Sequence, residues 1–88
     1  MNLYLISRKD SVSWDQYDSA VVAAKDETSA RYTHPNGKHI WREKRGGWFK
    51  NTWEDHSWVP PEELTVSLIG VATKGVKSGI VCASFNAG

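Results

Sequence analysis

The sequence predicts an α+β fold, in which one short helix packs against a small, mostly antiparallel sheet of four or five strands. Three observations support it. The chain has 88 residues, of which 40% are hydrophobic, and this length fits a single domain covering residues 1–88. Short apolar or alternating runs near both ends have the length and composition of strands. One segment, about residues 26–34, carries the signals of a helix.

Two short runs in the first third of the chain predict strands. Residues 3–7 are aromatic and branched, and residues 19–24 form a continuous apolar run that is typical of a buried strand. The segment 9–18 between them is polar and rich in turn-forming residues, so it predicts a loop.

The predicted helix has recognisable residues at both ends. Asp26 supplies a side-chain oxygen that can cap the first backbone amides, and Glu27 places negative charge in the first turn. Pro35 disfavours helical geometry in the residue before it, and the Asn36-Gly37 pair turns readily. These signals limit the helix to about two turns.

Residues 38–63 form the least regular part of the sequence. They hold four of the five tryptophans and are interrupted by Gly46-Gly47 and Pro60-Pro61. A short strand near 39–42 is expected at the start of this segment. Because the whole stretch is longer than an ordinary connection, we expect it to carry function.

The last third of the chain predicts an antiparallel C-terminal hairpin over residues 64–85. Residues 64–68 alternate, and the apolar positions then shift around Gly70, as they do at a β-bulge. The segment 74–79 is expected to form the loop of the hairpin. Cys82 lies in the apolar final strand and is expected to be a small buried hydrophobe.

The composition excludes several classes of protein. The net charge of +1 excludes a globally basic protein that coats DNA and an acidic mimic of DNA. No apolar run approaches the roughly 18 residues of a membrane span. The single cysteine excludes an intrachain disulfide and fits a reducing cytosol.

A hydrophobic core this small leaves a monomer marginally stable, so we expect a homo-oligomer.

Four segments resemble a family of short, mostly uncharacterised proteins of tailed bacteriophages. They are Asn2–Ser7, the YDSAVVAA sequence at 17–24, Thr33-His34-Pro35, and residues 81–88 with the terminal ASFNAG sequence; together they cover about half of the chain. The resemblance implies a phage protein made in the cytoplasm of the host bacterium, and it implies no activity. Because small phage proteins often oppose host defence, it favours an anti-defence role.

The charge pattern singles out residues 38–50. This segment carries five cations against one carboxylate, whereas 10–27 and 51–63 are acidic. Arginine forks bind phosphate bidentately, indole faces stack on bases, and a glycine pair permits close approach of a ligand. The acidic neighbours favour a small phosphorylated ligand or a partner protein over a long nucleic acid. The alternative is an ordinary edge hairpin that turns at Gly46-Gly47, with its tryptophans covering a small core.

Catalysis and metal binding have little support in the sequence. His34, His39 and His56 lack the spacing of a zinc site. No nucleophile and base come together in a known motif, and there is no phosphate-binding loop. We therefore expect a protein without enzymatic activity, metal or cofactor.

The combined expectation is a non-catalytic phage protein that sequesters a small nucleotide-derived immune signal. A host defence nuclease or effector, contacted directly, is the first alternative partner, and single-stranded nucleic acid is the second. The tryptophans would stack on the base, and the cations would bind phosphate. Residues of the first loop would complete the pocket, and the Asp18 carboxylate would bind the ribose. The expected ligand-binding residues are Trp14, Tyr17, Asp18, Trp41, Arg42, Lys44, Arg45, Trp48, Trp53 and Trp58.

Overall fold

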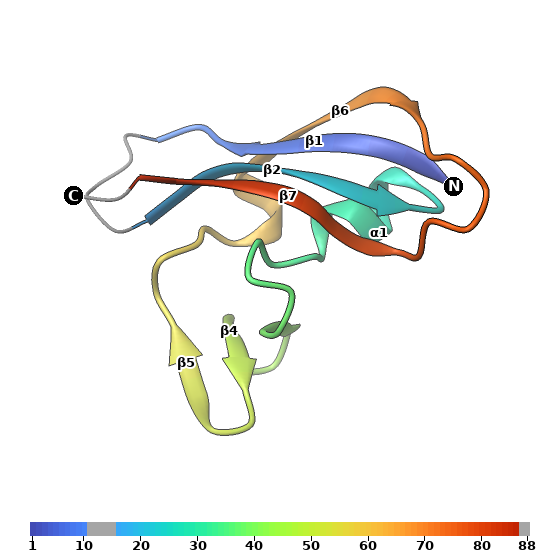
Figure 1. Ribbon diagram of the computed structural model, residues 1–88. Coiled ribbons are helices and arrows are strands. Elements are labelled where there is room, and N and C mark those ends of the chain that lie inside the picture. The colour runs from blue at the N-terminus through green and yellow to red at the C-terminus, as the bar shows by residue number, and fades with distance from the viewer. Residues whose placement is uncertain (11–15, 87–88) are drawn as a thin grey trace.

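The computed structural model describes residues 1–10 and 16–86. Within these residues the chain forms a four-stranded sheet, a three-stranded sheet, one α-helix and one 3-10 helix. Figure 1 shows the larger sheet as the upper layer, the helix beneath it, and the smaller sheet projecting below as a separate lobe. The predicted α+β class is confirmed.

The larger sheet is antiparallel throughout and has the strand order β6-β1-β2-β7. Its strands are β1 (Asn2–Arg8), β2 (Gln16–Ala24), β6 (Leu64–Val71) and β7 (Gly79–Asn86). The strands predicted at 3–7 and 19–24 are confirmed. β2 begins earlier than predicted, so the end of the predicted loop 9–18 belongs to the strand.

The predicted hairpin over residues 64–85 is wrong, because β6 and β7 lie at opposite edges of the larger sheet. β1 and β2 pair with each other and occupy the centre, and β6 then pairs with β1. The segment after β6 crosses the end of the sheet near the N-terminus (Figure 1), and the Ala72 amide donates to the Met1 carbonyl oxygen at 2.9 Å. The bulge expected around Gly70 is confirmed, because the register with β1 shifts there.

The helix α1 (Glu27–Arg31) is shorter than the predicted 26–34 segment. Its N-cap is Asp26, as predicted, and the side chain accepts a hydrogen bond from the Ser29 amide at 2.8 Å. Arg31, at the other end, donates to the carbonyl oxygens of Pro61 and Leu64 at 2.8 and 2.9 Å. These bonds join the helix to the start of β6.

The smaller sheet is formed entirely by the tryptophan-rich segment. Its order is β3 (Ile40–Arg42), β4 (Gly47–Lys50) and β5 (Trp53–Asp55), with antiparallel pairing, and β3 confirms the strand predicted near 39–42. A 3-10 turn, η1 (Pro61–Glu63), leads back into β6.

The hydrophobic core lies between the larger sheet, α1 and the smaller sheet. It includes Trp48 from β4 and Trp58 from the connection after β5, so the two sheets share one core. The buried members are Tyr4, Ile6, Ala20, Val22, Ala24, Ala30, Trp48, Trp58 and Leu64. Cys82 is exposed, so the prediction that it is a buried hydrophobe is wrong. None of the helices in the described residues has the length and hydrophobicity needed to cross a membrane.

Candidate functional site

Three cations of residues 38–50, Arg42, Lys44 and Arg45, gather around the turn between β3 and β4. An open hollow of about 550 Å³, here called the basic hollow, is lined by Trp41, Arg42, Glu43, Lys44, Arg45 and Asn51. A second hollow of about 250 Å³ is lined by His39, Lys50, Asn51 and Trp53. Asn51 lines both, so the two hollows adjoin. The structure thus brings together four of the predicted residues, and it places a fifth, Trp53, beside them.

The glycine pair shapes this turn. Gly46 has a φ of 66°, in the left-handed region that favours glycine, and its amide donates to the Arg42 carbonyl oxygen at 2.8 Å. Gly47 is buried, and a Cβ there would lie 2.7 Å from Glu54 Oε2. Gly46 therefore permits the backbone conformation of the turn, and Gly47 permits the close packing of β4 against β5.

The basic hollow is lined by three cations and one carboxylate, Glu43, which accepts a hydrogen bond from Trp41. Among the described residues, Arg42, Lys44, Arg45 and Lys50 form no ion pair. The Arg45 guanidinium lies over the Phe49 ring, 4.6 Å from its centroid. Such an arrangement leaves charged donors available to an anionic ligand.

The tryptophans divide into buried and exposed ones. Trp48 and Trp58 are 1% and 4% exposed, so their ring faces are closed to a ligand, and the stacking role predicted for them does not fit the structure. Trp48 packs in the core, where its Nε1 donates to the Val59 carbonyl oxygen at 2.9 Å. Trp41 is half-buried and packs edge to face on Trp48, and its Nε1 donates to Glu43 at 2.6 Å. Trp53 is 77% exposed.

The predicted contribution of the first loop is not found at the basic hollow. Trp14 lies outside the described residues. Tyr17 is half-buried and packs edge to face on Phe85, with ring centroids 4.9 Å apart. Asp18 accepts a hydrogen bond from the neighbouring Ser19 hydroxyl at 2.9 Å. Neither Tyr17 nor Asp18 lines the basic hollow or the hollow beside it.

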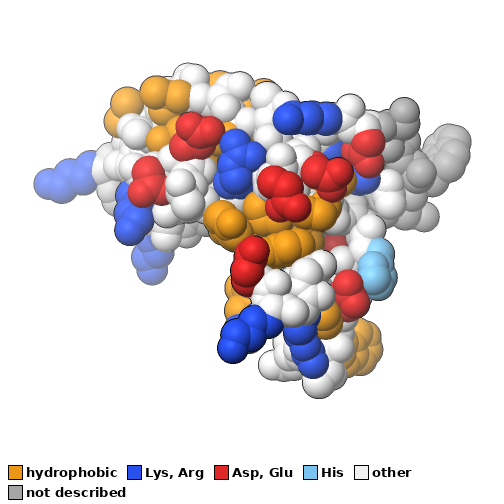
Figure 2. Space-filling view, turned by 180° about the vertical axis from the view of Figure 1, so that it is seen from behind, with side chains coloured by type: hydrophobic (Ala, Val, Ile, Leu, Met, Phe, Trp, Pro, Cys, Tyr) orange, Lys and Arg blue, Asp and Glu red, His pale blue; other side chains and the backbone are white. Residues whose placement is uncertain are grey.

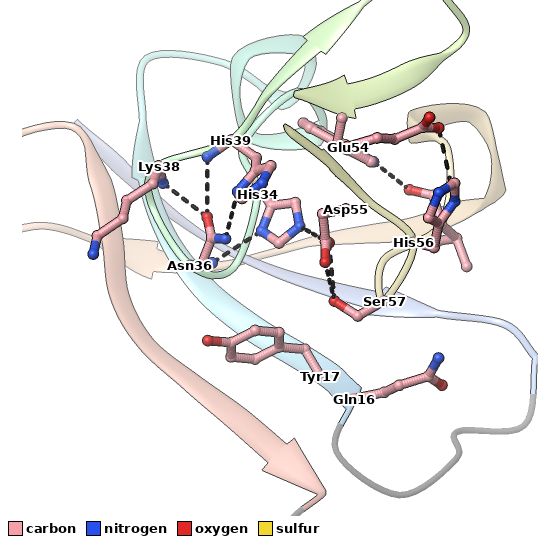
Figure 3. A network of polar contacts seen from close by, with 12 residues as sticks. Gln16, Tyr17, His34, Asn36, Lys38, His39, Glu54, Asp55, His56 and Ser57 are labelled. Atoms are coloured by element: carbon pink, nitrogen blue, oxygen red, sulfur yellow. Dashed lines mark hydrogen bonds and ion pairs between the residues drawn. The ribbon is translucent and has the colours of Figure 1, made fainter. Parts of the chain in front are cut away.

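A buried histidine network holds the smaller sheet to the rest of the molecule, and sequence reasoning missed it. Figure 3 shows His34 between the loop after α1 and strand β5. Its Nε2 lies 2.5 Å from Asp55 Oδ2, and its Nδ1 accepts from the Asn36 amide at 3.0 Å. The Ser57 hydroxyl also donates to Asp55. His34 and Asp55 are 21 residues apart, so no local pattern joins them.

The protonation states in this network follow from its geometry. Burial lowers the pKa of His34, and the hydrogen bond and charge of Asp55 offset this effect only in part. Burial raises the pKa of Asp55, but the hydrogen bonds from His34 and Ser57 outweigh it, so the net shift is downward. A neutral imidazole therefore donates from Nε2 to a charged carboxylate. Both ring nitrogens are occupied, which leaves neither free to act as a base on a substrate.

Neither a metal-binding cluster in the described residues nor similarity to known proteins points to a site. Within residues 1–10 and 16–86, no group of three or more His, Cys, Asp or Glu side chains could hold a metal ion. Comparison with family models, curated proteins and solved structures found no match.

Proposed function

We propose that this chain is a phage protein that antagonises bacterial immunity in the host cytoplasm by sequestering a small nucleotide-derived signal, without catalysis. The proposed binding site is the basic hollow together with the hollow beside it. One observation carries the proposal: the cations of this surface have no ion-pair partner among the described residues, and they lie next to the exposed indole of Trp53.

The chemistry of the two hollows suits a phosphorylated ligand that has an aromatic base. Arg42 and Arg45 can each grip a phosphate with two donors, and Lys44 adds a point charge. Trp53 offers a ring face for stacking. Asn51, between the hollows, carries both a donor and an acceptor that can bind the edge of a base. The volume of about 550 Å³ lies in the range of small-molecule sites, about 300–1,000 Å³.

The first experiment identifies the ligand. Protein purified from a host with activated defence is denatured, and the extract is analysed for nucleotides by mass spectrometry. The nucleotide found is then titrated calorimetrically into the parent and the variants. Arg42→Ala and Arg45→Ala should each weaken binding about tenfold or more, because each removes a charged contact worth about 1.5–3 kcal/mol. Trp53→Ala should cost about 1–3 kcal/mol in affinity.

Two control variants test whether a loss of binding is specific to the residues of the two hollows. Lys25→Ala removes an exposed cation outside the hollows, and Tyr32→Ala removes an aromatic ring that is 46% exposed on the helix C-cap. Both should bind like the parent, and all five variants should keep the parent's melting temperature within a few degrees. Normal binding by both arginine variants would place the ligand elsewhere and overturn the assignment of the site.

Direct inhibition of a host defence protein is the second candidate, and the exposed apolar residues of the smaller sheet favour it. Trp53 is 77% exposed and Ile40 is 50% exposed beside the cations of the hollows. Tryptophan and arginine are enriched among the residues that dominate binding energy at protein interfaces. Two results together would favour direct inhibition over sequestration of a nucleotide. The parent would neither co-purify with a nucleotide nor bind one, and Trp53→Ala and Arg45→Ala would fail to retain a host protein that the parent retains from lysate.

A further inference from the structure

The outer edge of β6 is a long, uncharged strand edge. Every residue from Leu64 to Val71 is neutral, and no other strand of the described residues pairs with this edge. Leu68, Ile69 and Val71 are 63%, 52% and 74% exposed. Figure 2 shows hydrophobic side chains gathered at the upper left, over the end of the larger sheet where β6 stops. Soluble proteins normally protect such an edge with charges, proline or repeated bulges.

The opposite edge of the larger sheet is interrupted nearer the middle of its strand. In β7 the bulged residue is Val81, because Val21 and Val22 of β2 pair with Cys82 and Ile80. In β6 the bulged residue is Ile69, close to the end of the strand, and the pairing with β1 is unbroken from Leu64 to Leu68. Because a bulge bends the strand that carries it, the longer regular edge of β6 is the more suitable one for pairing with another strand.

Opposite charges lie at the two ends of β6. Glu62 and Glu63 come directly before the strand, and Lys74 follows three residues after its end. All three are exposed, and none forms an ion pair within the described part of the chain. A strand that is neutral along its length, acidic at its start and basic past its end is complementary to an antiparallel copy of itself.

We propose that the chain forms a homodimer in which β6 pairs antiparallel with β6 of a second copy, so that the larger sheet continues across a two-fold axis. In this arrangement the start of one β6 lies beside the end of the other. Glu62 and Glu63 of each copy then approach Lys74 of its partner, whereas parallel pairing would bring like charges together.

The exposed apolar side chains are buried by the same arrangement. Leu68 lies near the middle of β6, so a two-fold axis there brings Leu68 and Ile69 of the two copies together. Leu64 at the start of the edge is bonded to Arg31 and Pro61 of its own chain, and the backbone donors and acceptors further along the edge are satisfied by the partner strand. The dimer does not depend on the nucleotide, so its failure and the failure of the proposed function are distinguishable.

The first test is the mass of the particle in solution. Light scattering at micromolar concentration should report twice the 9.9 kDa of one chain. Leu68→Lys places a charge at the two-fold axis of the β6 edge, where it meets the same charge of the partner, and should give a folded monomer. Val81→Lys adds a lysine at a 51% exposed position of β7 and should leave the dimer intact. Circular dichroism should show that both variants are folded. A monomeric parent, or a dimer that is lost in Val81→Lys and kept in Leu68→Lys, overturns the proposal.

The second test exchanges the charges at the ends of β6. A chain with Glu62→Lys and Glu63→Lys has three lysines at the two ends, and a chain with Lys74→Glu has three glutamates. Each should dimerise at least about tenfold more weakly than the parent, because like charges meet at both ends. An equal mixture should form heterodimers, in which both ends are again complementary. Unchanged self-association of both chains, or no heterodimer in the mixture, rules out this antiparallel arrangement.

Discussion

His34 is held between two groups that together determine its protonation state. The Asn36 amide donates to Nδ1, so the proton of the neutral ring must be on Nε2, where it faces Asp55. A second proton would have to replace the Asn36 hydrogen bond in a fully buried position. The His34 side chain is therefore a structural hydrogen-bond donor that joins the loop after α1 to β5. Its protonation makes the free energy of unfolding depend on pH.

The stability of the protein should fall in mildly acidic solution. The folded pKa of His34 is lower than the unfolded value of about 6.5, so below that pH the unfolded state binds more protons and the free energy of unfolding decreases. The pKa of Asp55 is also lowered, so its contribution is lost at still lower pH, below about 4. Urea unfolding at a series of pH values measures both effects.

His34→Gln tests which group carries the first effect. The variant should be less stable at neutral pH by about 1–3 kcal/mol, because Asp55 loses a donor, and its stability should change less between pH 7 and 5. His56→Gln is the control, because that side chain is 80% exposed, and it should behave like the parent. A His34→Gln variant with the full acid sensitivity of the parent would contradict the assignment.

At the scale of elements, the turn between β3 and β4 presents the cations of the basic hollow. Gly46 at its end has a positive φ, and a Cβ there would meet nothing within 4 Å. The requirement for glycine is therefore conformational. Gly47, one residue later, is required for space, because a Cβ would press on Glu54 and Phe49.

Gly46→Ala should destabilise the protein by about 1–2 kcal/mol, the cost of placing an L side chain in the left-handed region. Gly46→Asn should cost less, because asparagine tolerates this conformation better. Gly47→Ala should cost more than Gly46→Asn, since a backbone or side chain must move. Chemical denaturation of the three variants measures these differences, and equal stability of Gly46→Ala and the parent would contradict the prediction.

At the scale of the whole molecule, the two sheets form one packed unit although Figure 1 shows two lobes. Trp48 and Trp58 extend from the tryptophan-rich segment into the core of the larger sheet. Arg8 of β1 donates to the Tyr17 and Ser57 carbonyl oxygens at 3.2 and 2.9 Å, and it lies 6.0 Å from the centroid of the Trp58 ring. Neither sheet keeps a complete core without the other.

The two sheets should therefore unfold in a single transition. Tryptophan fluorescence reports mainly on residues 41–58, and far-UV circular dichroism reports on the strands of both sheets. The two denaturation curves should have the same midpoint, as for a two-state domain. Trp53→Phe removes the exposed fluorophore and should leave that midpoint unchanged. A fluorescence transition at lower denaturant than the circular dichroism transition would show that the smaller sheet unfolds separately.

Most of the local elements of this protein follow from short stretches of its sequence. Strands at 3–7 and 19–24, the cap at Asp26 and the bulge at Gly70 each depend on a few adjacent residues, and such signals can be read locally. The concentration of cations in residues 38–50 was equally visible, and with it most of the candidate site.

Strand pairing and side-chain exposure depend on the packing of segments that are distant in the sequence. The pairing of β6 with β1 joins segments far apart in the chain, and the contact of His34 with Asp55 joins the loop after α1 to β5. The tryptophans look alike in the sequence, but packing between the sheets buries Trp48 and leaves Trp53 in solvent. Burial depends on what a distant segment places opposite a side chain, and local patterns do not contain that information.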